Sequence, residues 1–92
     1  MIINFRCGDT ESLFTTGSSR RWTAILTVAQ RKLNMLNAAT TIQDLGSPPG
    51  NRLEALQGNR QGQHSIRIND QYRICFIWGA YGPESVEIVD YH

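Results

Sequence analysis

The sequence predicts one α+β domain over residues 1–92, in which two N-terminal helices pack on an antiparallel β-sheet. Three observations lead to this fold class. Residues 63–92 alternate apolar and polar side chains with the period of two that is typical of β-strands. Residues 20–39 instead repeat apolar side chains at helical spacing. The length of 92 residues suits a single domain with one modest core.

The expected sheet is a meander of three strands in the last third of the chain. Its strands are rich in β-branched and aromatic residues, and the turns between them contain Asn69-Asp70 and the segment 79–83. Side chains of equal strand parity share one face of a sheet. We therefore expect four residues of the central strand in the core: Tyr72, Ile74, Phe76 and Trp78.

Shorter elements precede the meander. Residues 2–5 are expected to form a short first strand, and residues 52–57 another strand that leads through a glycine-bracketed turn into the meander. Asp9 is expected to cap a short helix, with Glu11 in its first turn, where the helix dipole favours an acidic side chain. The long helix over residues 20–39 should bury the face formed by Trp22, Ile25, Leu26, Ala29, Leu33 and Leu36.

The basic residues suggest two possible roles. Arg20 and Arg21 are expected at the start of the long helix, where the dipole disfavours cations, so they either serve a binding partner or are solvated loop charges. The formal net charge of +1 argues against a protein that binds nucleic acid by charge alone. Eight of the nine basic residues are arginine, which suits bidentate contact with phosphate, although a GC-rich genome produces the same bias.

The cysteines and apolar segments indicate a cytoplasmic protein. Cys7 and Cys75 form neither a CxxC motif nor a metal-ligand spacing, as is usual for thiols in a reducing compartment. The N-terminal residues lack a signal-peptide pattern, and no apolar run approaches the ~18 residues that span a membrane. We therefore expect no membrane association. Because no cofactor-binding or metal-binding motif is present, we also expect no cofactor.

A basic stripe is predicted on the meander. Arg60, Arg67 and Arg73 lie there, with only Asp70 opposing them. Two interpretations are open: together with His64 this sheet face holds RNA phosphates, or it is an ordinary solvated surface.

The final residues form a second candidate group. Asp90 and His92 share strand parity, so Tyr91 is expected to point to the other side of the strand unless the strand bulges or frays. A carboxylate beside an imidazole orients it for general acid–base catalysis, and an arginine on a neighbouring strand would stabilise an anionic transition state. These residues suit RNA transesterification; the alternative is a solvated chain end.

Several stretches together resemble the HigB toxins of the RelE/ParE superfamily. They are Gly50–Leu56, Gly58-Asn59-Arg60, Gly62, Ser65–Ile74 and the closing Asp90-Tyr91-His92. The resemblance implies the RelE-like two-layer fold and a ribosome-dependent endoribonuclease that cuts mRNA in the ribosomal A site. It also implies a HigA-like helix-turn-helix antitoxin as partner, through which the toxin–antitoxin complex would bind operator DNA.

The resemblance also assigns residues. Four match the family's catalytic positions: Arg73, Asp90, Tyr91 and His92. We assign RNA binding to Arg60, Arg67, Gln57, Arg20 and Arg21. Two positions depart from the family pattern: Gln57 stands where relatives can carry lysine, and Glu54 where some carry histidine. Because ParE-type members inhibit gyrase without cleaving RNA, gyrase inhibition stays open as an alternative, as does a non-catalytic RNA-binding module.

Overall fold

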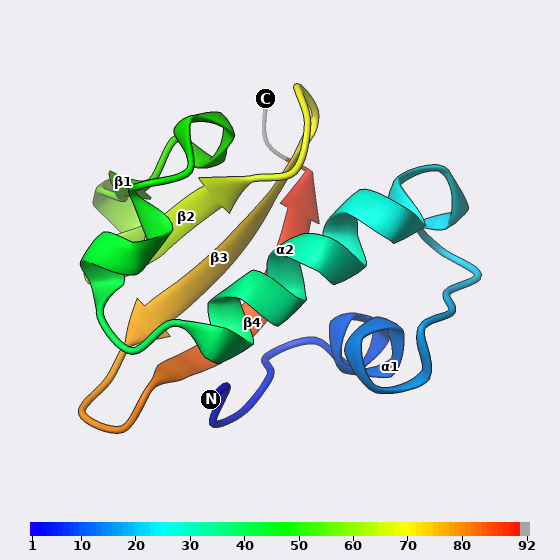
Figure 1. The fold of residues 1–92 in the computed structure, drawn as a ribbon, viewed down its shortest axis with the longest axis horizontal. Coiled ribbons are helices and arrows are strands. Elements are labelled where there is room, and N and C mark those ends of the chain that lie inside the picture. Colours follow the sequence, from blue (N-terminus) through cyan, green and yellow to red (C-terminus); the bar gives the residue numbers. More distant parts are fainter. Residues whose placement is uncertain (91–92) are drawn as a thin grey trace.

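Two layers form the domain in the computed structural model, which describes residues 1–90. The helices α1 (Gly8–Thr16) and α2 (Leu26–Ala38) lie on one face of a four-stranded antiparallel sheet (Figure 1). The strand order is β1-β2-β3-β4, which follows the chain. The predicted α+β class, with its N-terminal helices on an antiparallel sheet, is confirmed.

The three-stranded meander is present as predicted. Its strands are β2 (His64–Arg67), β3 (Tyr72–Trp78) and β4 (Pro83–Asp90). Ile66 pairs with Ile74, and Ile74 pairs in turn with Ile88, so one apolar row crosses all three strands. The pairing of β3 with β4 is irregular between Cys75 and Ile77, which is a β-bulge.

The core lies between α2 and the sheet. Leu33 and Leu36 of α2 are fully buried, and so are Ile74 and Phe76 of β3. The face of the long helix was therefore predicted correctly, with Leu26 partly buried at its margin. Of the aromatic residues expected in the core, Phe76 is inside it, while Tyr72 and Trp78 are partly buried and pack against it.

The long helix begins later than predicted. α2 starts at Leu26 and is preceded by a 3₁₀ turn over Thr23–Ile25, so Arg20 and Arg21 lie in the connecting loop. The Ser19 hydroxyl accepts hydrogen bonds from the backbone N–H groups of Arg21 and Trp22, both at 3.1 Å. These two bonds form a turn over residues 19–22, and the chain reaches α2 only after this turn and the 3₁₀ turn.

The predicted cap of the first helix was also wrong. Cys7 is the N-cap residue, in an extended conformation, and Asp9 lies inside the first turn. The first backbone hydrogen bond runs from the Glu11 N–H to the Cys7 carbonyl, so the helix begins two residues too early for Asp9 to cap it. Asp9 and Glu11 still face the positive end of the helix dipole.

The first strand of the sheet is shorter than predicted. β1 contains only Glu54–Ala55 instead of residues 52–57. Arg52 has φ +45°, a left-handed conformation that cannot continue a strand, and the chain enters a 3₁₀ turn at Gly58. The Leu56 N–H still bonds to the Gln63 carbonyl at 2.9 Å, which extends the pairing by one residue.

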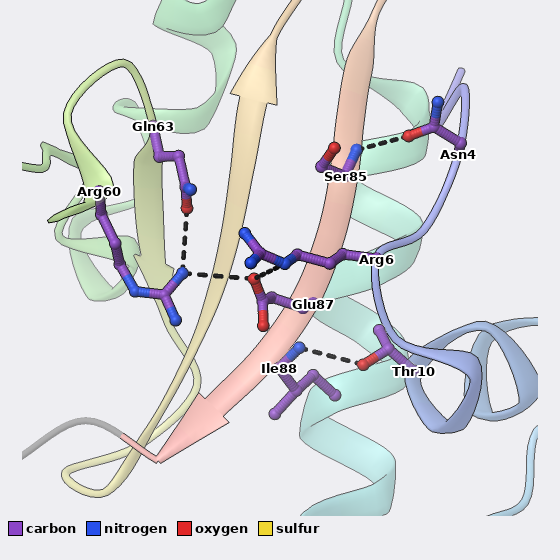
Figure 2. Close-up of polar contacts among 8 residues, drawn as sticks. All are labelled: Asn4, Arg6, Thr10, Arg60, Gln63, Ser85, Glu87 and Ile88. Carbon is purple, nitrogen blue, oxygen red and sulfur yellow. Dashed lines mark hydrogen bonds and ion pairs between the residues drawn. The ribbon is translucent and has the colours of Figure 1, made fainter.

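The N-terminal segment runs beside β4 without becoming a strand. An isolated parallel bridge joins Phe5 to Val86, in place of the predicted strand over residues 2–5. The Asn4 side chain accepts a hydrogen bond from the Ser85 N–H at 2.6 Å (Figure 2). Ser85 has φ +52° and lies between the β4 residues that pair with Ile77 and Cys75, where the register of β3 and β4 shifts.

None of the helices in the described chain combines the length and the apolar character that crossing a bilayer requires.

Candidate active site on the sheet face opposite the helices

The sheet face turned away from α2 carries the candidate site. On β3, alternation directs Arg73 and Cys75 to this face, opposite to Ile74 and Phe76. Cross-strand pairing then aligns two rows on it. One row contains Arg67, Arg73 and Val89, and the next contains Ser65, Cys75 and Glu87.

Arg73 is held by acceptors from neighbouring segments. Its Nη1 atom lies 3.2 Å from Glu54 Oε1, 3.3 Å from Ser65 Oγ and 3.5 Å from the Arg52 carbonyl oxygen. The Arg73 side chain is only 14% exposed, whereas that of Glu54 is 45% exposed. A guanidinium that is fixed and largely desolvated in this way is preorganised to bind an anion.

Glu54 is a site residue that the sequence analysis did not predict. It was treated only as a departure from the family pattern, yet its carboxylate forms an ion pair with Arg73. The pairing of Glu54 with Ser65 on β2 brings it to this face. The sequence indicates the contact between Glu54 and Arg73 only indirectly, because predicting it requires the register of β1 on β2 as well as that of β2 on β3.

A second ion-pair cluster spans the same face (Figure 2). Arg60 Nη1 lies 3.3 Å from Glu87 Oε2 and 3.1 Å from Gln63 Oε1. Arg6 Nε lies 3.6 Å from the same Glu87 oxygen. Glu87 is 15% exposed, so one partly buried carboxylate on β4 joins an arginine from the N-terminal segment to one from the turn before β2.

The predicted stripe of basic residues opposed only by Asp70 is therefore wrong. Arg67 pairs with Asp70, but Arg60 pairs with Glu87 and Arg73 with Glu54. Glu54 comes from β1, which precedes the meander, and Glu87 comes from β4, the last strand of the meander itself. Sheet pairing brings them to the arginines, so this face has alternating charges.

His64 lies on the other face. It pairs with Phe76, and the two rings stack with centroids 6.2 Å apart. Its Nδ1 atom is buried and lacks a hydrogen-bond partner among residues 1–90. The expectation that His64 shares a face with the arginines is wrong, because strand alternation places it with the core residues Ile66 and Phe76.

Asp90 ends β4 at the same end of the sheet as Arg73. Asp90 pairs with Tyr72 and Val89 pairs with Arg73, so alternation assigns Asp90 and Arg73 to opposite faces of neighbouring strands. The Asp90 carboxylate is exposed and accepts a hydrogen bond from Gln71 Nε2 at 3.1 Å. The other two candidate catalytic residues, Tyr91 and His92, lie outside the described residues.

The remaining candidates for RNA binding lie in two places. Gln57 is exposed beside Arg60, at the start of the turn between β1 and β2. Arg20 and Arg21 line a hollow of about 510 Å³ that also contains Asp9 and four hydroxyl side chains. Arg21 pairs with Asp9 at 3.2 Å and lies 4.6 Å from the centroid of the Trp22 ring. The α1–α2 loop lies far from β1 in Figure 1, so these two arginines are not part of the Arg73 site.

Cys75 lies under the ion pairs but is poorly suited to nucleophilic chemistry. It is fully buried, and burial raises the pKa of its thiol, partly offset by the nearby Arg60 guanidinium. A protonated, inaccessible thiol is a weak nucleophile. Within residues 1–90, no group of three His, Cys, Asp or Glu side chains converges in a way that could hold a metal ion.

Comparison with known proteins identifies the family to which this sequence is similar. The family described as the RelE-like toxin of the type II toxin–antitoxin system HigB matches residues 6–92. Toxin HigB-1 of Vibrio cholerae is 56% identical over 48 residues, which are 52% of this chain and 50% of that protein. An uncharacterised protein of Haemophilus influenzae is 38% identical over 72 residues, which are 78% of this chain and 64% of that protein.

Each match thus covers less than two thirds of the relative's own length. The family match, in contrast, extends over nearly the whole of this chain and includes β1 to β4 together with the Arg73 site. The chain belongs to the HigB family of RelE-like toxins.

Proposed function

We propose that this protein is the toxin of a type II toxin–antitoxin system and that it cleaves mRNA in the A site of translating ribosomes in the cytoplasm. The observation that carries the proposal is the Arg73 guanidinium, which is largely buried yet already binds the carboxylate of Glu54. Family membership supports the same assignment. A phosphodiester could replace that carboxylate, because both are oxyanions that accept hydrogen bonds from a guanidinium.

In the proposed reaction, the ribose 2′-oxygen attacks the adjacent phosphorus and the bond to the 5′-oxygen breaks. The products are a 2′,3′-cyclic phosphate and a 5′-hydroxyl end. Arg73 neutralises the charge that builds up on the phosphorane oxygens. Because Arg73 is mostly desolvated, this interaction is stronger than it would be in water.

Two proton transfers complete the proposed reaction. Glu54, beside Arg73, accepts the proton of the 2′-hydroxyl. His92 donates a proton to the leaving 5′-oxygen and Tyr91 contacts the nucleotide, while Asp90, which alternation places on the face opposite to Arg73, positions the chain end that carries them. Arg60, Arg67 and Gln57 bind the flanking RNA, and Arg20 and Arg21 bind ribosomal RNA. Arg60 and Arg67 would then exchange Glu87 and Asp70 for phosphates.

The proposed partner is a helix-turn-helix antitoxin of the HigA type, which would neutralise the toxin and carry the complex to operator DNA. Coexpression of the two proteins should yield a stable complex on size-exclusion chromatography. Binding of operator DNA should require the antitoxin, because the toxin itself has a net charge of only +1.

Primer extension on mRNA tests the activity. With translating ribosomes present, adding the protein should produce breaks within codons of the reading frame, and omission of ribosomes should abolish them. A DNA gyrase supercoiling assay on the same preparation should show no inhibition. If mRNA stays intact and the protein blocks supercoiling by gyrase, the protein is a gyrase inhibitor and the proposal is wrong. If the protein binds mRNA without cutting it, it is an RNA-binding module without nuclease activity.

A further inference from the structure

A lysine is buried on the apolar face of α2. Lys32 is 5% exposed and is flanked on the helix by the fully buried Leu33 and Leu36. Burial lowers the pKa of its ammonium group, and the charges of Arg31 and Arg67 lower it further. No carboxylate among residues 1–90 forms an ion pair with Lys32, so this cation is costly for the fold.

The partner of this lysine is a fully buried asparagine. Lys32 Nζ donates a hydrogen bond to Asn51 Oδ1. The amide nitrogen of Asn51 donates to the Leu45 carbonyl at 3.0 Å and lies 3.1 Å from the Met35 sulfur. The Asn51 backbone N–H bonds to the Pro48 carbonyl at 3.0 Å. Asn51 is thus fixed relative to α2 on one side and to its own loop on the other.

The residues that follow Asn51 supply two acceptors to the candidate catalytic arginine. Arg52 has φ +45°, a conformation that costs free energy for a residue with a Cβ atom. Its carbonyl oxygen lies 3.5 Å from Arg73 Nη1, and Glu54 Oε1 lies 3.2 Å from the same atom. The strained backbone at Arg52 requires neighbours that hold it, and Asn51 is its immediate neighbour.

We infer that Lys32 and Asn51 are positioning residues for the Arg73 site: their hydrogen bond fixes the segment 51–54, so that the Arg52 carbonyl and the Glu54 carboxylate hold the Arg73 guanidinium. The inference rests on the proposed function for the catalytic importance of Arg73. Lys32 acts through the loop and contacts neither RNA nor the reacting atoms.

Three variants separate this role from simple packing. Lys32→Met removes both the charge and the donor but keeps an unbranched side chain suited to a buried site. Lys32→Gln removes the charge but keeps an N–H donor for Asn51. Arg31→Met is the matched control, because Arg31 is the exposed neighbouring cation on the same helix.

Two measurements are made on each folded variant: the guanidinium ¹H–¹⁵N resonance of Arg73 by NMR, and single-turnover cleavage of mRNA on translating ribosomes. For Lys32→Met we expect a melting temperature at or above that of the parent, a shifted Arg73 resonance, and cleavage about 10–100-fold slower at saturating ribosomes. In Lys32→Gln the Arg73 resonance and the cleavage rate should both return most of the way to the parent values, and Arg31→Met should change neither.

An unchanged Arg73 resonance in Lys32→Met overturns the inference, and so does a shifted resonance with an unchanged cleavage rate. The NMR measurement needs no activity. If the parent protein cuts no mRNA, the proposed function is wrong. The NMR measurement still decides whether this hydrogen bond positions Arg73, through the shift of the Arg73 resonance in Lys32→Met and its return to the parent position in Lys32→Gln.

Discussion

Arg73 Nη1 lies 3.2 Å from Glu54 Oε1, although β2 separates the strands on which the two residues lie. The Arg73 side chain therefore extends across β2 and also contacts Ser65 on it. This arrangement gives Glu54 two opposing effects in the proposed site. It competes with RNA for the guanidinium, and it accepts the 2′-hydroxyl proton.

Glu54→Gln should separate these two effects. Loss of the charge removes one competitor of phosphate for the Arg73 guanidinium, so ribosome-bound mRNA should be bound a few-fold more tightly, since a half-exposed ion pair contributes only about 0–1 kcal/mol. Loss of the proton acceptor should slow cleavage by about 10²–10⁴-fold. Single-turnover rates measured over a range of ribosome concentrations give both values. The control is Glu11→Gln, an exposed position on α1, and a Glu54→Gln protein that cuts at the parent rate would remove Glu54 from the chemistry.

Leu33→Ala tests the packing of α2 on the sheet. Leu33 is fully buried at the centre of the helix face, so its truncation should lower the free energy of unfolding by about 2–5 kcal/mol. Asn34→Ala, at the next and exposed position, should change it by no more than about 0.5 kcal/mol. Urea denaturation monitored by tryptophan fluorescence measures both, and equal losses for the two variants would contradict the core described above.

Reversal of charge at Arg20 and Arg21 tests the role of the α1–α2 loop. The double variant Arg20→Glu and Arg21→Glu should bind ribosomes more weakly at low salt, with the difference shrinking as salt rises, because each lost phosphate contact releases about 0.7 fewer counterions. The cleavage rate at saturating ribosomes should stay the same, since the loop lies far from β1 (Figure 1). Ribosome affinity equal to that of the parent would show that both arginines are only solvated.

His92→Gln tests the proposed general acid. A histidine that acts as a general acid must be protonated, so parent cleavage should decline as the pH rises and the imidazolium form is lost. The variant should be slower by about 10²–10⁴-fold and should lack this part of the pH profile. Rates between pH 5.5 and 8.5, with melting curves to verify folding, make the comparison. An unaltered profile would exclude His92 as the acid.

The repeating patterns predicted most of the fold, because a helix face or a strand face depends on local spacing. Leu33 and Phe76 were placed in the core for this reason. The predictions failed where a single side chain or backbone angle decided the outcome. The left-handed conformation of Arg52 shortens β1, and a turn fixed by Ser19 stands where the long helix was expected to begin.

The site was harder to predict than the fold, because its contacts join residues from strands that are not neighbours. Glu54 and Glu87 meet Arg73 and Arg60 only through the register of several strands, and the sequence spacing between them carries no sign of it. The contact of Lys32 was unpredictable for the same reason, since local patterns give no reason to expect a buried lysine that bonds to an asparagine in a distant loop.

The most direct test of the central claim is the rate at which a folded Arg73→Ala protein cuts mRNA on translating ribosomes, measured by primer extension beside the parent and Arg73→Lys. Loss of the guanidinium should reduce cleavage by about 10²–10³-fold or more, and lysine should restore little, because a point charge cannot reproduce the bidentate fork. Cleavage by Arg73→Ala at the parent rate would contradict the account.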